Sequence, residues 1–111
     1  MRVLRIKPGE LPELIDVENE LHALQKEVGG YIECVTTSHD TVIICNEEGL
    51  LDGSRFNFIA DGNYIFGTVL IAGVSGEEFC DIPEDAEMAY IAAWGVTKKM
   101  CDEKREELER S

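Results

Sequence analysis

The chain has no long hydrophobic run. Its longest apolar stretch, residues 64–74, has 11 residues and contains two glycines, whereas a membrane-spanning helix needs about 20 apolar residues. Residues 2–7 alternate charged and apolar side chains and lack the continuous apolar region of a secretory signal peptide. We therefore expect a cytoplasmic protein that neither crosses nor binds a membrane.

Short cysteine spacings are also missing. The four cysteines are Cys34, Cys45, Cys80 and Cys101, and no two of them lie within four residues of each other. A structural zinc site usually has a chelating step such as C-x-x-C, and disulfides do not persist in a reducing compartment. The sequence predicts free, structural thiols, with no metal and no cofactor.

Basic residues are scarce. The chain has 10 Lys and Arg against 23 Asp and Glu, giving a formal net charge of −13. Two blocks carry acids without any base: residues 10–20 hold five and residues 77–87 hold six. Because nucleic-acid binding depends on cations that neutralise phosphates, we expect no direct nucleic-acid binding.

The remaining composition, 44% hydrophobic over 111 residues, fits one folded domain. Residues 2–7 read as a strand, and residues 13–17 either begin a helix or form a second strand. We favour the strand, because Asn19 is a good N-cap for a helix that starts at Glu20. Leu21, Leu24 and Val28 form the expected core stripe of that helix. Gly29 and Gly30 end it.

A hairpin is expected next, with strands at residues 31–37 and 41–46 and a turn at His39 and Asp40. Counting outward from this turn gives four pairs: Thr36 with Ile43, Cys34 with Cys45, Glu33 with Asn46, and Tyr31 with Glu48. Cys34 and Cys45 would then share one face of a core-facing sheet.

The second half suggests a long loop at residues 47–63, a central strand at residues 64–74, and a helix capped by Asp81. We expect Met88, Ile91 and Ala92 on the core side of this helix, and Trp94 is a further candidate. Gly95 should break or kink it, and the charged stretch from about Thr97 should project or fray. The predicted fold is α+β: a single domain at residues 1–95 and a charged helical extension at residues 96–111. An antiparallel or mixed sheet of about four to five strands carries two main helices on one side.

Catalytic residues are hard to find. His22 and His39 are the only histidines, and both suit structural positions, on a helix and at a turn. Asp52-Gly53 and Asp61-Gly62 lack the spacing of a calcium loop and suit turns instead. We therefore expect no enzyme.

Polar residues gather at the open end of the predicted hairpin. They read either as a helix cap with a strand end and a turn, or as a small recognition surface. The candidate binding residues are Tyr31, Glu33, Asn46, Glu48, Arg55 and Asn57.

One combination of motifs is specific. Leu24-Gln-x-x-Val-Gly-Gly-Tyr-Ile-Glu33, Cys45-Asn-Glu-Glu-Gly49, and then Gly53, Asn57 and Gly67-Thr68 follow each other in this order. The pattern, over roughly residues 2–92, resembles a family of small proteins catalogued only as a domain of unknown function. Its members occur in phages, plasmids and conjugative elements of bacteria, so the resemblance implies a mobile-element setting in a bacterial host. It supplies no activity and no functional residue, and the charged tail after Trp94 departs from it.

These observations leave three hypotheses. The first is an accessory protein that binds a host or element protein, for instance in antirestriction or anti-defence, through an acidic surface formed by Glu77, Glu78, Glu84 and Glu87; its extreme form mimics DNA. The second is a small-molecule or catalytic domain that uses Tyr31, Asn46, Glu48 and Arg55. The third is a structural domain without a site.

The cysteine spacing generates a first test. Thiol titration of reduced, denatured protein should find four free thiols, and elemental analysis should find no stoichiometric zinc. Fewer thiols, or one zinc per chain, would contradict the structural assignment.

Overall fold

The computed structural model describes residues 1–38, 40–51, 53–60 and 62–110. His39, Asp52 and Asp61, which the sequence assigned to turns, lie outside this part. Within it, one antiparallel sheet has the strand order β2-β1-β7-β4-β3, and β8 pairs with β7. The strands of this sheet are β1 (Arg2–Ile6), β2 (Glu13–Asp16), β3 (Ile32–Ser38), β4 (Thr41–Asn46), β7 (Val69–Ser75) and β8 (Glu78–Cys80). The α+β class is confirmed, and so is the second strand at residues 13–17.

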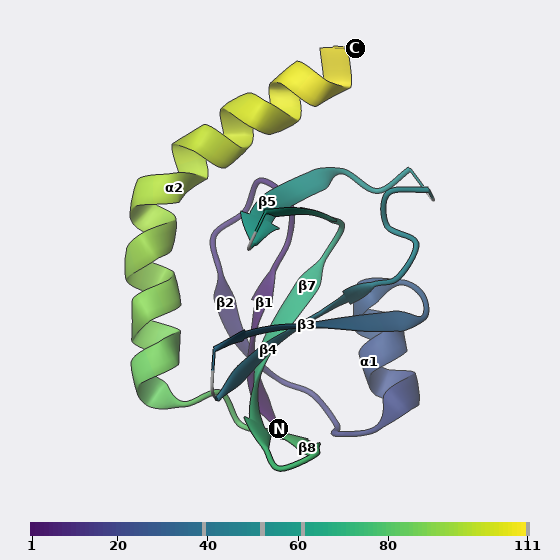
Figure 1. The fold of residues 1–111 in the computed structure, drawn as a ribbon, viewed down its shortest axis with the longest axis vertical. Coiled ribbons are helices and arrows are strands. Elements are labelled where there is room, and N and C mark those ends of the chain that lie inside the picture. Colours follow the sequence, from purple (N-terminus) through teal and green to yellow (C-terminus); the bar gives the residue numbers. More distant parts are fainter. Residues whose placement is uncertain (39, 52, 61, 111) are drawn as a thin grey trace.

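The sheet is covered on both faces (Figure 1). Helix α1 (Leu21–Val28) packs on one face, where Leu24 and Val28 meet the side chains of Val42 and Leu70. The other face is covered by the hairpin of β5 (Phe56–Ala60) and β6 (Asn63–Phe66) together with α2 (Glu84–Arg110). The expectation of helices on one side is therefore wrong. Two covers are needed because the central strands carry apolar side chains on both faces.

The β3–β4 register differs from the prediction by one residue. Cys34 lies opposite Ile44, and Glu33 lies opposite Cys45. The register shifts between Thr36 and Ser38, as a β-bulge does when it adds one residue to a strand. Because side chains alternate along a strand, Cys34 and Cys45 lie on opposite faces of the sheet.

The predicted strand at residues 64–74 is two strands. Residues 63–66 form β6 in the hairpin, and residues 69–75 form the central strand β7. Gly67 lies between them with φ +85°, a left-handed conformation that ends an extended segment. The supposed long loop at residues 47–63 contains β5, which the sequence reading missed.

Both helix starts need correction. Glu20, not Asn19, caps α1, since its carboxylate accepts a hydrogen bond from Ala23 N at 2.8 Å. Asp81 accepts instead from the backbone N of Arg2 at 2.8 Å, and α2 begins only at Glu84. The side chains of Asn19 and Asp81 instead form hydrogen bonds to segments far away in the sequence. Local capping motifs do not reveal such a role.

Helix α2 also has a different buried face. Trp94 is buried, and its ring packs edge-to-face against the ring of Phe58 with 5.2 Å between the ring centroids. Met88 and Ile91, in contrast, are 63% and 47% exposed. The helix continues through Gly95 without a break, and its axis bends part-way along (Figure 1).

The charged C-terminal segment does not fray. Arg105 is 4% exposed and donates to the backbone oxygens of Phe56 and Asn57 and to the Asp102 carboxylate. A buried guanidinium needs such partners, because an unpaired buried charge costs several kcal/mol. Arg105 therefore anchors the last turns of α2 to β5.

The α1 stripe generates a matched stability test. Leu24 is 2% exposed, as expected of a core residue, but Leu21 is 58% exposed. The assignment of Leu21 to the core was therefore wrong. Leu24→Ala should lower the free energy of unfolding by about 2–5 kcal/mol, and Leu21→Ala should change it by less than about 0.5 kcal/mol. Chemical denaturation measures both, and equal effects would contradict this packing.

Candidate functional site

The open end of the β3–β4 hairpin adjoins the C-terminus of α1. Tyr31 lies between α1 and β3 and is 71% exposed, while Asn46, the last residue of β4, is 8% exposed. Gln25, Gly29 and Gly30 complete the lining of a cavity of about 370 Å³ that Tyr31, Asn46 and Glu48 share. Three of the predicted binding residues therefore meet here.

The Asn46 side chain holds this end together. Its Nδ2 donates to Val28 O at 3.4 Å, and its Oδ1 accepts from Glu48 N at 2.8 Å. A Cβ added to Gly30 would lie 3.0 Å from Asn46 Nδ2. The amide thus joins the end of α1 to the turn after β4, which is a structural role.

The other predicted binding residues lie elsewhere. Glu33 is exposed on β3 and lines a second cavity, of about 270 Å³, together with Asn46. Arg55 forms an ion pair with Glu109 of α2 at 2.8 Å. Asn57 is fully buried on β5, where Nδ2 donates to Ile6 O and Gly67 O at 2.9 Å each. Neither Arg55 nor Asn57 lines the Tyr31 cavity.

The two acid-only blocks meet at the opposite end of the molecule. Asn19 Nδ2 donates to Phe79 O at 2.8 Å, which brings residues 18–20 beside β8. Strand pairing places Asp16 opposite Arg2, and the backbone N of Arg2 bonds to Asp81. We call the exposed carboxylates gathered here the acidic end: Asp16, Glu18, Glu77, Glu78 and Glu84.

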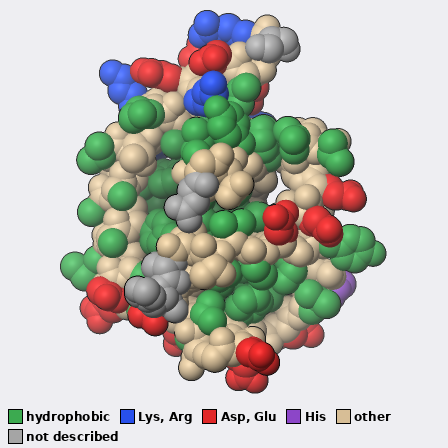
Figure 2. Space-filling model, viewed as in Figure 1, with side chains coloured by type: hydrophobic (Ala, Val, Ile, Leu, Met, Phe, Trp, Pro, Cys, Tyr) green, Lys and Arg blue, Asp and Glu red, His purple; other side chains and the backbone are tan. Residues whose placement is uncertain are grey.

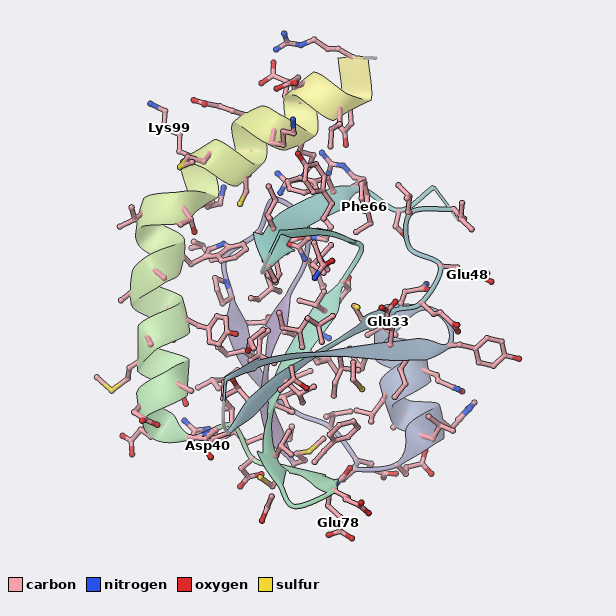
Figure 3. The ribbon with its side chains drawn as sticks, viewed as in Figure 1. Glu33, Asp40, Glu48, Phe66, Glu78 and Lys99 are labelled. Carbon is pink, nitrogen blue, oxygen red and sulfur yellow. The ribbon has the colours of Figure 1, made fainter. Side chains whose placement is uncertain are left out.

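Charge is distributed unequally along the molecule. On the face shown in Figure 2, Lys and Arg side chains lie over the C-terminal half of α2, and the lower end shows Asp and Glu. Figure 3 labels Glu78 at that lower end, and it labels Glu48 at the open end of the β3–β4 hairpin, which we call the hairpin end. Glu87, predicted as part of the acidic surface, is 9% exposed and pairs with Arg2 at 2.8 Å. Glu87 therefore stabilises the fold of this region and is not part of its exposed acidic surface.

The comparisons with known proteins agree with the motif pattern. Residues 1–95 match the family described as a domain of unknown function (DUF3846). The chain belongs to this family. No curated protein and no solved structure matched the chain.

The residues that carry the resemblance to the DUF3846 family build backbone geometry. Gly29 closes α1 with φ +83°. A Cβ on Gly49 would lie 2.7 Å from Phe66 O, a distance at which the backbone must shift. Asn57 ties β5 to the turn at Gly67. These motif residues explain why the hairpins and α1 meet as they do, and they name no reaction.

Three of the four thiols have a raised pKa. Burial raises the pKa of Cys45 to about 11, with a further contribution from the charge of Glu33. Partial desolvation also raises the pKa of Cys101 and of Cys34, although the Cys34 side chain is exposed on β3 and not in the core. A thiol that stays protonated at neutral pH neither attacks an electrophile nor binds a metal readily.

The described residues contain no group of three His, Cys, Asp or Glu side chains able to hold a metal ion. His22 is exposed on α1. No described helix is both long enough and apolar enough to cross a membrane.

Sequence reasoning missed one apolar concavity, between the β5–β6 hairpin and α2. It has a volume of about 400 Å³ and includes Phe56, Ile59, Tyr64 and Met100 in its lining. Lys104 lies 5.7 Å from the centre of the Tyr64 ring. The sequence signal was weak because β5 was read as loop and the phase of α2 was wrong.

The hairpin end generates a test that separates structural from available residues. Gly49→Ala should lower the free energy of unfolding by about 1–3 kcal/mol, because the new methyl group meets the Phe66 carbonyl. The exposed changes Tyr31→Ala and Glu48→Gln should stay within about 0.5 kcal/mol. Urea denaturation compares the three, and a neutral Gly49→Ala would refute the close approach.

Proposed function

We propose that this chain is an interaction protein of a mobile genetic element that binds a basic surface of a host or element protein through its acidic end. The carrying observation is that acids from two blocks about sixty residues apart converge while remaining unpaired. Asp16, Glu18, Glu77, Glu78 and Glu84 form no ion pair with any described residue.

The contrast with the other end supports this proposal. Along the C-terminal half of α2, most of the charged side chains pair with one another, as in Lys98 with Asp102 at 2.7 Å and Arg110 with Glu106. Such pairing neutralises the surface locally, whereas the acidic end leaves its field open to solvent. An uncompensated field of one sign accelerates encounter with an oppositely charged partner.

The carboxylates of the acidic end are free to act in binding because the fold does not depend on them. Exposed charges contribute about 0–1 kcal/mol each to stability. Neutralising several of them should therefore change partner binding more than folding.

The Tyr31 cavity supports the alternative of a small-molecule site less well. Its most buried polar group, the Asn46 amide, is already bonded to Val28 O and Glu48 N. Tyr31 and Glu48 remain exposed beside it, so this end serves as the comparison surface in the experiment.

The test uses two variants of equal charge change. In the first, Glu18, Glu77, Glu78 and Glu84 are changed to Gln; in the second, Glu33, Glu47, Glu48 and Glu103 are changed to Gln. Wild type and both variants are used to capture partners from host lysate at low and at physiological salt, with mass spectrometry of what is retained.

We expect one protein to be retained by wild type and by the second variant, and lost with the first variant or as salt rises. Retention by all three at both salt levels would refute the acidic end as the contact. Loss with the second variant alone would move the contact to the surfaces that carry Glu33, Glu47, Glu48 and Glu103.

A further inference from the structure

Helix α2 exposes an apolar face that the protein's own fold leaves uncovered. Its buried side carries Tyr90, Trp94 and Arg105, which pack toward the sheet and the β5–β6 hairpin. On the opposite side, Met88 is 63% exposed and Val96 is 77% exposed, with exposed Ala92 between them. The spacing of four residues places all three on one stripe.

The stripe is symmetric in its chemistry. Met88 and Val96 lie four residues before and after Ala92, and Asp85 and Lys99 lie seven residues before and after it. A second copy of α2 running antiparallel across Ala92 would set Met88 against Val96 and Asp85 against Lys99. A two-fold contact requires this kind of self-complementarity, because each residue of one copy contacts the same partner position in both halves of the interface.

Lys99 supplies an independent observation. Its neighbours on α2 are paired within the chain, Lys98 with Asp102 at 2.7 Å and Lys104 with Glu107 at 3.4 Å. Lys99 is exposed, forms no ion pair with a described residue, and points away from the sheet (Figure 3). Asp85 is exposed as well, and the only described hydrogen bond of its carboxylate is the one that it accepts from the backbone N of Ala86.

We propose that the chain forms a homodimer through the outer face of α2, with Ala92 on the two-fold axis, Met88 packed against the partner's Val96, and Asp85 paired with the partner's Lys99. The small side chain of Ala92 lets the helices approach closely at their crossing point. Asp85 and Lys99 each lie seven residues from Ala92, which is about 10 Å along the helix from the two-fold axis. At this level of the dimer, the long side chain of the partner's Lys99 can reach across to Asp85.

The dimer should be modest in affinity. The outer side of α2 is convex because the helix bends around the body (Figure 1), so two copies touch over only a few turns. Such a contact should bury less than the roughly 1,600 Å² of a standard interface, so we expect a weak and reversible dimer. The net charge of −13 on each copy also opposes association at low salt.

This inference is independent of the proposed partner. Binding of a basic protein at the acidic end weakens as salt rises, whereas two acidic copies associate better once their long-range repulsion is screened. Failure of one proposal therefore leaves the other standing.

The decisive experiment is a charge exchange, followed by sedimentation velocity over about 1–500 µM protein at physiological salt. Asp85→Lys and Lys99→Asp each place like charges opposite each other in both pairs of the dimer. Each single change should weaken the dimer about tenfold or more. The double variant restores opposite charges and should recover an affinity close to that of wild type.

A second set of variants tests the apolar contact. Val96→Glu should abolish dimerisation over the same range, and Leu50→Glu, a matched change at another exposed apolar residue, should leave it intact. Circular dichroism confirms that each variant is folded. Under mild oxidation Ala92→Cys should form a covalent dimer faster than Glu77→Cys, because only residues at the two-fold axis meet their own copies.

A wild-type chain that stays monomeric to the highest concentration would overturn the proposal. So would a dimer in which the double exchange fails to rescue the single changes, since rescue requires the two positions to face each other across copies. A dimer abolished by Leu50→Glu but not by Val96→Glu would equally exclude this face.

Discussion

The rest of the structure depends on the burial of β7 on both faces. Val69, Leu70, Ile71 and Ala72 are fully buried in succession, so neither side of this strand can face water. One short helix covers one side, and covering the other takes the β5–β6 hairpin together with α2. Burying each large aliphatic side chain contributes about 1.5–3 kcal/mol, which makes the two-sided cover the main source of stability for so small a chain.

The second cover creates a problem of its own, because a hairpin and a helix laid over a sheet carry backbone groups into the interior. Two polar side chains satisfy those groups. Asn57 donates to Ile6 O and Gly67 O, and Arg105 donates to the carbonyls of Phe56 and Asn57. Together they connect β1, β5 and α2 through hydrogen bonds. Arg105 lies beyond the family match, which ends at residue 95, so this chain's own tail contributes to holding the hairpin in place.

The sequence predicted those parts of the fold that local chemistry decides. Gly29 ends α1 in any context, because a left-handed residue closes a helix at little cost, and the apolar run at residues 69–74 requires a buried strand. The prediction from sequence failed where two registers of a strand, or two faces of a helix, suit the local sequence equally well. Thr37 falls at a register shift in β3, and one extra residue reverses every later side chain. In α2, Met88 and Trp94 lie on different stripes of equal helical quality, and only contact with Phe58 decides which is buried. The candidate site followed the same division: Tyr31, Asn46 and Glu48 meet because they flank chain turns, while Arg55 and Asn57 depend on a hairpin that the sequence concealed.

Charge and hydrophobicity are separated on this molecule in a way that folding alone does not require. Most acids near the C-terminal end of α2 are paired within the chain, whereas the five carboxylates of the acidic end form no ion pair with a described residue. The uncovered apolar stripe runs between these regions on the outer side of α2. A protein selected only for solubility has no reason to expose Met88 and Val96, since water-facing apolar patches favour association. Exposure of that stripe beside a net charge of −13 therefore suggests a limited, reversible contact: charge prevents indiscriminate aggregation, while one self-complementary face remains available for a specific one.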